Sequence, residues 1–439
     1  MLKNYCIVGL GSRGLSMFAA DILEHYADVA QLTGLCDINP GRVQYAQRVL
    51  GENIPGFTDF DAMLDSVDCD IVIVTTKDAT HDDFIVRSMQ RGKDVISEKP
   101  MTTDEKKCQR ILRTEKETGR SLRVTFNYRY APYKTEIKRL LSQGIVGDIH
   151  SVEFRWFLDT VHGADYFRRW HARKENSGGL LVHKATHHFD LINWWLGLDP
   201  VEVAAMGSRQ FYLSARQPNH GERCATCKVT DACEFYLELS RDKELKSLYQ
   251  DQEGYDGYFR DGCVFSDHID IEDTMSALIR YPNQVQVTYA LTAATPFEGW
   301  QVAFNGSKGR LEAFEPESFV VADDMTEFAH RSSGRKTTDW RRASNDHDTP
   351  LEQLEVRFYP LFGGVQTFPV PHVTAGHGGG DRRLRDDLFR EVQSDPLGHI
   401  AGSKAGAMSI LVGVAANRSI ATGQFVKIAD LFDPCDVVS

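Results

Sequence analysis

Apolar and polar positions follow two different rhythms along the chain, and the change falls near residue 126. Before it, short apolar runs predict strands buried on both faces, and the stretches between them predict helices. Strands are expected at 2–8, 31–36, 70–76, 94–97 and 121–126, and helices from residue 15 onward and at 42–50, 57–65, 81–91 and 103–118. This alternation is typical of an α/β, doubly wound parallel sheet.

After residue 130 the apolar positions recur at every second residue, which indicates strands with one buried face. Strands are expected at 149–158, 276–281, 284–291, 301–305, 309–314 and 355–359, helices at 181–196, 381–393 and 404–422, and a polar loop at 330–349. The pattern predicts an α+β domain with an open, mostly antiparallel sheet. We place the first domain at 1–126 and the second at 127–439, with an insertion at about 208–263.

The first predicted strand runs directly into a G-x-G-x-x-G turn at residues 9–14, and a helix follows. In this setting the spacing indicates a dinucleotide-binding turn. Gly9 permits the tight turn, Gly11 lets a pyrophosphate approach the backbone, and Gly14 lets helix and strand pack closely. Ser12 and Arg13 lie in the same turn, at a helix N-terminus whose unpaired N–H groups favour phosphate. Residues 1–126 are therefore expected to form a Rossmann domain.

The second predicted strand ends in Asp37. This is close to the position, ~20 residues after the glycine turn, where a ribose-binding acid is expected. A carboxylate there hydrogen-bonds the ribose 2′-hydroxyl and repels a 2′-phosphate, so NAD is expected rather than NADP. The alternative is that Asp37 only caps the following turn. Segments 75–78, 98–100 and 127–129 also follow strands, at the edge of the sheet where ligands bind.

Lys99 lies between Glu98 and Pro100 at the end of a predicted strand. Proline restricts the preceding residue to extended geometry, which fixes the Lys99 backbone. Its ammonium is expected to bind and polarise a substrate hydroxyl or carbonyl beside a nicotinamide. The alternative is a surface lysine in a turn.

If residues 181–196 form one helix, then His183, His187, Asp190 and Trp194 share one face of it. The apolar residues on another face suit burial, so we expect this polar face to point away from the core. A histidine titrates near neutrality and can take the proton of an alcohol. The alternatives are surface or internally bonded histidines, or a zinc site built from two histidines and a carboxylate.

Composition limits the partners. The net charge of −12 and the absence of a long basic run argue against a nucleic-acid partner. No apolar run approaches the ~18 residues of a membrane span, and we expect neither a signal peptide nor a membrane. We therefore expect a cytoplasmic protein with reduced thiols.

Four of the nine cysteines, Cys224, Cys227, Cys233 and Cys263, fall within about forty residues of the insertion. In a cytoplasmic protein this clustering favours a metal site, and a structural zinc would staple a segment with little core of its own. An iron–sulfur cluster and free buried thiols are the alternatives.

The glycine turn, the sequence Glu98-Lys99-Pro100, and Gly178-Gly179 before a helix with His187 together resemble the Gfo/Idh/MocA oxidoreductase family over nearly the whole chain. Members of that family use NAD or NADP to oxidise or reduce sugars, inositols and related polyols. They join a Rossmann domain to a domain whose open sheet often forms oligomer contacts. The resemblance thus implies a sugar or polyol substrate and a homo-oligomer, dimeric or tetrameric, formed through that sheet.

The resemblance also assigns roles. Lys99 is implied to be the catalytic lysine and His187 the acid/base. His183 occupies the place of an aspartate in many members, and Lys184 beside it is a candidate substrate ligand. The segment of Thr75, Thr76 and His81 matches one that borders the cofactor, although its usual proline and asparagine are missing. Cofactor contacts are therefore expected at Gly9, Gly11, Ser12, Arg13, Gly14, Asp37, Arg42, Thr75, Thr76, His81, Glu98, Lys99 and Asn127.

Four more residues are candidates for substrate binding. Arg129 follows a strand end, and Trp170 could stack on a sugar or belong to the core. His377 and Asp381 lie in a His-Gly-Gly stretch similar to that of family members that are NAD-dependent glycosidases; alternatively, Asp381 caps a helix.

We therefore predict an NAD-dependent dehydrogenase that acts on CH–OH groups of sugars. The alternatives are a glycoside hydrolase that oxidises its substrate transiently with bound NAD, and a non-catalytic NAD-bound regulator.

Overall fold

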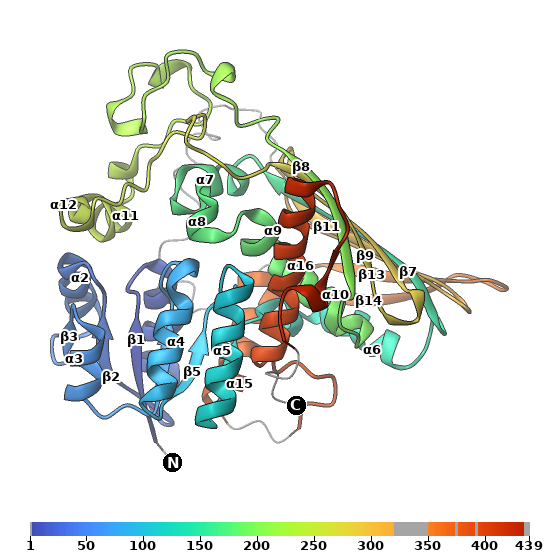
Figure 1. Ribbon diagram of the computed structural model, residues 1–439, viewed down its shortest axis with the longest axis horizontal. Coiled ribbons are helices and arrows are strands. Elements are labelled where there is room, and N and C mark those ends of the chain that lie inside the picture. Colours follow the sequence, from blue (N-terminus) through green and yellow to red (C-terminus); the bar gives the residue numbers. More distant parts are fainter. Residues whose placement is uncertain (1, 320–349, 374–375, 391–393, 434–439) are drawn as a thin grey trace.

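The computed structural model of the chain describes residues 2–319, 350–373, 376–390 and 394–433 (Figure 1). The predicted loop at 330–349 lies outside these residues, as does the end of the predicted helix at 381–393. Among the described residues, no helix is both long and apolar enough to cross a membrane.

The N-terminal part forms a six-stranded sheet in which all neighbours pair in parallel, in the order β3-β2-β1-β4-β5-β6. The strands are β1 (Lys3–Val8), β2 (Ala30–Cys36), β3 (Gly56–Phe57), β4 (Ile71–Val74), β5 (Asp94–Ser97) and β6 (Leu122–Val124). The helices between them are α1 (Ala20–His25), α2 (Pro40–Leu50), α3 (Phe60–Ser66), α4 (His81–Gln90) and α5 (Glu105–Thr118). This confirms the doubly wound parallel sheet.

Both faces of this sheet are covered, as the continuous apolar strands require. Val72 and Val74 of β4 pack with residues of α3, α4 and α5, while Ile73 between them packs with residues of α1 and α2. The helix predicted at 57–65 begins later than expected, at Phe60. Gly56 and Phe57 before it form the edge strand β3. The helix predicted from residue 15 starts as a π-helical segment at Gly14–Ala19.

The rest of the chain builds a nine-stranded sheet in the order β14-β13-β12-β11-β7-β10-β9-β8-β15, in which only β7 and β10 pair in parallel. The strands are β7 (Ile149–Asp159), β8 (Glu202–Ser208), β9 (Thr274–Arg280), β10 (Gln286–Thr295), β11 (Phe297–Gly306), β12 (Gly309–Phe319), β13 (Pro350–Pro360), β14 (Gln366–Val373) and β15 (Val426–Lys427). The prediction of an open, mostly antiparallel sheet is confirmed.

Helices cover one face of this sheet: α6 (Pro132–Ser142), α7 (His162–Arg168), α8 (Lys174–Ser177), α9 (Leu180–His183), α10 (Ala185–Leu196) and α16 (Ser403–Thr422) (Figure 1). The prediction of a single helix at 181–196 is wrong in one respect. In the structure this segment is divided into α9 and α10 at Lys184. The face with His183, His187, Asp190 and Trp194 is also buried, contrary to expectation.

Helix α15 (Gly376–Phe389) returns to the N-terminal sheet late in the chain. Its Leu384 and Phe389 join the core formed by α1 and β1, and its Arg385 forms an ion pair with the buried Asp21. The first residues of this segment, His377 to Gly379, have positive φ values, so the chain turns sharply before the regular helix. The turn places Asp381 beside Arg13 and Asn127, and His377 beside the rings of Tyr128 and His187.

Candidate active site

The glycine turn is packed tightly against the end of β4. Gly9 has φ +96°, and a Cβ atom on it would lie 2.6 Å from the carbonyl carbon of Thr75. A Cβ atom on Gly14 would lie 2.3 Å from the carbonyl oxygen of Gly9. The hydroxyl of Thr75 donates to that same oxygen at 2.6 Å. Only glycine fits at these two positions, so the turn has the close backbone approach expected of a phosphate-binding loop.

The carboxylate of Asp37 lies beside this turn and is buried. It accepts backbone hydrogen bonds from Leu10 at 2.8 Å and from Asn39 at 2.9 Å. It also lies 3.3 Å from Nη1 of Arg42. The bond from Asn39 is the turn cap considered above, and the bond from Leu10 ties the carboxylate to the glycine turn. Asp37 and Arg42 therefore share one loop cluster with residues 9–14.

Lys99 reaches from the end of β5 into the second domain. Its Nζ donates to the carbonyl of His183 at 3.4 Å, and its backbone N–H donates to Glu98 at 3.3 Å. Burial, helped by the positive charges of Lys184 and Arg13, lowers the pKa of Lys99 to about 8 although Asp78 and Glu98 oppose the shift. A lysine with this pKa is cationic at neutral pH and gives up its proton just above it.

The break between α9 and α10 places His183 against the N-terminal domain. Its Nδ1 lies 2.5 Å from Oδ2 of Asp78, which follows β4. Burial raises the pKa of Asp78 well above its usual range and lowers the pKa of His183 well below its usual range. Burial thus opposes a full ion pair in which both groups are charged.

His187 lies one turn further along, stacked on the ring of Tyr128 with centroids 4.4 Å apart. Burial, together with the positive charges of Lys99, His377 and Lys184, lowers the pKa of His187 well below its usual value. Its Nδ1 is buried and has no hydrogen-bond partner among the described residues. A neutral imidazole with a free ring nitrogen is a proton acceptor, as the acid/base hypothesis requires.

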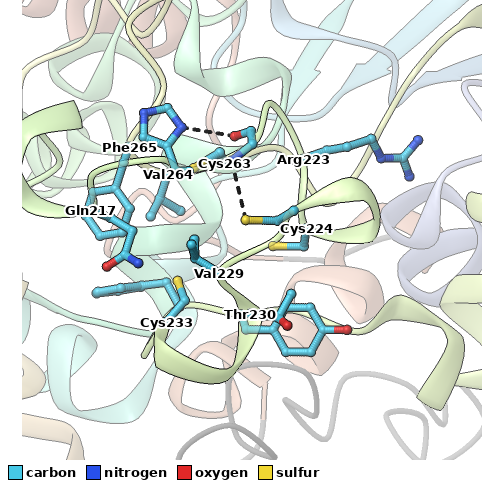
Figure 2. Close-up of a pocket in the computed structure, with 14 residues that line it drawn as sticks. Gln217, Arg223, Cys224, Val229, Thr230, Cys233, Cys263, Val264 and Phe265 are labelled. Atoms are coloured by element: carbon cyan, nitrogen blue, oxygen red, sulfur yellow. Dashed lines mark hydrogen bonds between the residues drawn. The ribbon is translucent and has the colours of Figure 1, made fainter.

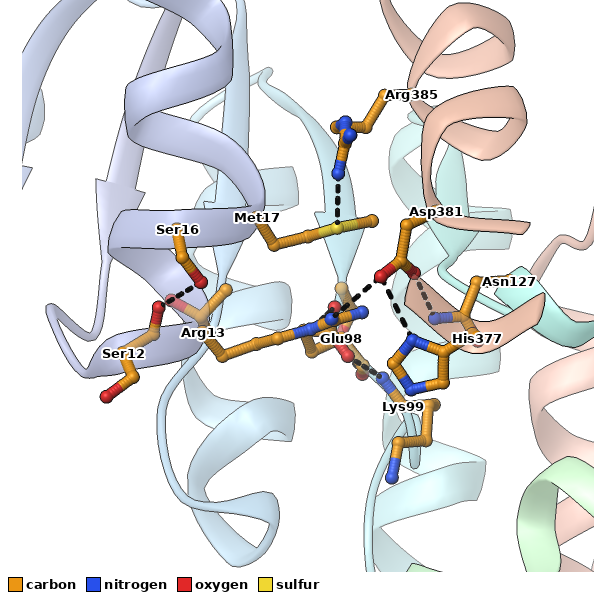
Figure 3. Close-up of polar contacts among 12 residues, drawn as sticks. Ser12, Arg13, Ser16, Met17, Glu98, Lys99, Asn127, His377, Asp381 and Arg385 are labelled. Carbon is orange, nitrogen blue, oxygen red and sulfur yellow. Dashed lines mark hydrogen bonds and ion pairs between the residues drawn. The ribbon is translucent and has the colours of Figure 1, made fainter. Parts of the chain in front are cut away.

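Helix α15 adds a charged network to the same region (Figure 3). Nε of Arg13 lies 2.8 Å from Glu98, and its Nη1 lies 3.8 Å from Asp381. Asp381 also accepts from Asn127 at 2.6 Å and lies 3.0 Å from Nδ1 of His377. Although burial opposes it, the charges of His377 and Arg13 hold the pKa of Asp381 well below its usual range. The structure thus brings together five residues predicted separately from the sequence.

A second polar group comes from the nine-stranded sheet. Nζ of Lys184 lies 3.7 Å from the carboxylate of Glu298 and 4.6 Å from the ring centre of Trp156. His162 lies 2.8 Å from Glu298, and the hydroxyl of Tyr166 lies 2.8 Å from the other nitrogen of His162. Sequence reasoning identified Lys184 but missed Glu298 of β11 and His162 of α7, since nothing in their local sequence distinguishes them from other polar residues.

Some predicted site residues have structural partners. Arg129 forms a bidentate pair with Asp190 at 2.5 and 2.8 Å and is 6% exposed. Both ring nitrogens of His81 face backbone carbonyls, those of Pro100 at 2.9 Å and Thr76 at 3.1 Å. His81 therefore positions the segments that carry Thr76 and Lys99.

Trp170 lies at the edge of the histidine cluster. Its ring stacks on His171 with centroids 3.6 Å apart and meets the ring of His183 edge-on at 5.8 Å. Thr76 lies at the end of β4, where its hydroxyl accepts a hydrogen bond from Thr80 at 2.9 Å. Trp170 thus extends the site toward the insertion, while Thr76 extends it along the N-terminal sheet.

The four insertion cysteines do come together, but not as a metal site. They line one pocket with an empty volume of about 330 Å³, as Figure 2 shows for Cys224, Cys233 and Cys263. No set of three His, Cys, Asp or Glu side chains in the described part of the chain could hold a metal ion. Burial also raises the pKa of Cys263 to about 11. The predicted structural zinc site is therefore not borne out by the described residues.

A Rossmann sheet with a glycine turn, joined to an open-sheet domain that adds a histidine beside a lysine, defines a nucleotide-binding oxidoreductase fold. Two family descriptions match the chain: "Oxidoreductase family, NAD-binding Rossmann fold" over residues 3–126, and "Oxidoreductase family, C-terminal alpha/beta domain" over residues 138–428. The chain belongs to the Gfo/Idh/MocA oxidoreductase family.

Individual relatives agree with this assignment. The chain is 36% identical to the Bacillus subtilis (strain 168) protein YteT, which is named as an oxidoreductase, over 98% of this chain and 99% of YteT. It is 23% identical to the inositol 2-dehydrogenase/D-chiro-inositol 3-dehydrogenase of Lactiplantibacillus plantarum, over 46% of this chain and 57% of that protein. Among solved structures, the WlbA dehydrogenase of Bordetella pertussis, crystallised with NADH and UDP-GlcNAcA, shares the fold with a TM-score of 0.62 and 18% identity, covering 97% of this chain and 99% of that one.

Proposed function

We propose that the protein is an NAD-dependent oxidoreductase that acts on a hydroxyl or carbonyl group of a sugar or polyol. The observation that carries this proposal is that a lysine from one domain acts electrostatically on a histidine from the other, whose Nδ1 has no hydrogen-bond partner among the described residues. Lys99 contacts the carbonyl of His183, and the Lys99 charge lowers the pKa of His187. Oxidation of an alcohol needs both groups, one to bind the oxygen and one to take its proton.

The residues of the N-terminal domain fit a dinucleotide. A Cβ atom on Gly11 would lie 3.1 Å from the hydroxyl of Tyr249, so the missing side chain permits the close approach of that hydroxyl to the turn. Residues 9–14 would hold the pyrophosphate and Asp37 a ribose hydroxyl, which favours NAD over NADP. When bound, the nicotinamide accepts or returns a hydride. In this proposal residues 1–126 bind the cofactor and residues 127–439 bind the substrate.

The side chains of the chain itself manage the proton and the charge. The ammonium of Lys99 hydrogen-bonds the substrate oxygen and stabilises the negative charge that develops on it during oxidation. Nδ1 of His187 accepts the hydroxyl proton, and in reduction it returns that proton. The Asp78–His183 pair holds the backbone carbonyl that orients Lys99. The tight packing around both groups excludes water from the reacting oxygen.

A polyhydroxylated substrate suits the remaining side chains. Glu298 and Lys184 offer an acceptor and a donor, and Trp170 and His377 lie near the histidines, so hydroxyls on several ring carbons could each find a partner. The inositol dehydrogenase name of one relative supports this class of substrate. Arg129 is omitted from the proposed substrate site because Asp190 occupies its guanidinium.

The test is to incubate the purified protein with NAD and a panel of sugars, inositols and glycosides, and to follow NADH absorbance and released aglycone together. The proposal expects NADH to form with at least one sugar or polyol. Binding of NAD without turnover of any compound would contradict it and would favour a regulator.

One observation favours a second candidate, a glycoside hydrolase that uses bound NAD transiently. The ring of His377 lies 6.1 Å from that of His187, so two imidazoles could serve the successive proton transfers of elimination and water addition. Release of aglycone without accumulation of NADH would favour this activity over the dehydrogenase.

We also propose a homo-oligomer formed through the open face of the nine-stranded sheet. The strand register places Met206, Ser276, Ala290, Arg155, Gln301 and Phe314 in one row across that face. Met206 is 77% exposed and Phe314 is 45% exposed. These two exposed apolar side chains, in a row that is otherwise largely polar, would favour pairing of this sheet face with a second copy. Light scattering of the purified chain would test the oligomer.

Free thiols on all described cysteines support a cytoplasmic location.

A further inference from the structure

The insertion does more than carry cysteines, because one part of it packs on the proposed cofactor site. This part runs from Lys243 to Tyr258 and contains helices α11 (Lys243–Leu248) and α12 (Glu253–Asp256). Figure 1 shows both helices above α2, on the side of the N-terminal sheet where the strands end. We call residues 243–258 the cap.

The cap contacts the glycine turn directly. The hydroxyl of Tyr249 accepts a hydrogen bond from the backbone N–H of Ser12 at 2.8 Å and lies 3.1 Å from the Ser12 hydroxyl. The backbone N–H groups of this turn are the ones expected to bind a pyrophosphate. The cap therefore reaches the phosphate end of the site.

The cap also contacts the segment that would bind the adenosine ribose. Oδ2 of Asp256 lies 2.7 Å from Nη2 of Arg42, and Nη1 of the same guanidinium lies 3.3 Å from Asp37. The carbonyl of Gln252 accepts from the Asn39 side chain at 3.0 Å, which fixes the cap on the loop after β2. The arginine is thus held between two carboxylates, one from each domain.

We propose that Asp256 is a specificity-determining residue that excludes NADP from the cofactor site. In Rossmann sites an arginine in this region accommodates the 2′-phosphate of NADP, while an acid binds the 2′-hydroxyl of NAD. Arg42 is correctly placed for the first role, but Asp256 already neutralises it. A 2′-phosphate would meet Asp37 and Asp256, and the guanidinium of Arg42 is already engaged by both carboxylates. This inference rests on the proposed function. It makes Asp256 of the cap a second acid that, together with Asp37, selects NAD over NADP.

The test compares the Kd of NAD and of NADP, by calorimetry, for the full-length protein and for Asp256→Asn. The variant removes one of the two carboxylates that hold Arg42 while keeping a side chain of the same size. NADP should bind about tenfold more tightly, the effect of one charge-assisted hydrogen bond, and the Kd of NAD should change less than threefold. Asp256→Glu should keep the selectivity of the wild type.

Asp251→Asn is the matched control, because Asp251 belongs to the same cap but pairs with Lys246 at the surface. It should leave both Kd values unchanged. An unchanged ratio of NADP to NAD affinity in Asp256→Asn, with NAD still bound by the wild type, would overturn the inference and leave the proposed function intact. A wild type that binds neither dinucleotide would overturn the proposed function itself.

Discussion

Nδ1 of His183 lies 2.5 Å from Oδ2 of Asp78, and the two residues come from different domains. Asp78 follows the fourth strand of the N-terminal sheet, whereas His183 ends α9 of the second domain. The carbonyl of His183 accepts from Lys99, so this contact between domains also fixes the proposed catalytic lysine.

Replacing Asp78 should alter the titration of Lys99. The charge of Asp78 raises the Lys99 pKa, so Asp78→Asn should lower that pKa further below about 8. If the cationic lysine is the active form, the alkaline fall in kcat should move to lower pH. The pH profile of kcat tests this, with Asp83→Asn as a control because Asp83 pairs with Arg87 at the surface. An unmoved alkaline limb would show that Asp78 does not influence the lysine.

The wild-type enzyme should itself have a bell-shaped pH profile in the oxidation direction. Activity should fall as the pH rises through about 8, because Lys99 then loses its proton. It should also fall at acid pH, below the usual pKa of histidine, because His187 is then protonated and cannot accept a proton. A profile that keeps rising above pH 8 would contradict the role of the lysine.

Lys99→Met should reduce kcat by about 10²-fold or more and leave the Kd of NAD nearly unchanged, because the side chain acts on the substrate oxygen. Steady-state kinetics and calorimetry measure the two quantities. Lys106→Met, at an exposed position of α5, is the matched control and should change neither. An equal loss of NAD affinity in Lys99→Met would assign the lysine a structural role.

The Arg129–Asp190 pair should contribute to stability and not to catalysis. Both side chains are buried, and removing one partner leaves the other charge unpaired. Arg129→Met should lower the free energy of unfolding by about 3–5 kcal/mol. Denaturant unfolding followed by fluorescence measures this change. A variant of normal stability with a raised KM would instead return Arg129 to the substrate site.

Much of the first domain could be predicted because its signals are local. The apolar runs, the glycine turn and the proline after Lys99 each constrain a few neighbouring residues, and the structure has the corresponding elements. The break at Lys184 was missed because no glycine or proline marks it. The residue before it, His183, pairs with Asp78 of the N-terminal domain, a contact that lies 105 residues away in the chain.

Contacts between distant segments also could not be predicted from the sequence. Asp256 and Tyr249 lie more than 200 residues from the glycine turn, and nothing in the spacing of the insertion shows that it folds back on that turn. The cysteines of the same insertion gave a clear pattern, but the described residues do not bear out a zinc site, because spacing alone does not determine whether four sulfur atoms reach tetrahedral geometry.

The central claim is that Lys99 and His187 act together on one substrate oxygen, and a double-mutant cycle tests it most directly. The measurement is kcat of Lys99→Met, His187→Gln and the double variant, with the substrate found in the panel and saturating NAD. We predict that each single variant loses about 10²-fold or more, and that the double variant is about as active as the weaker single variant. Losses that multiply in the double variant, or a single variant with full activity, would contradict the claim.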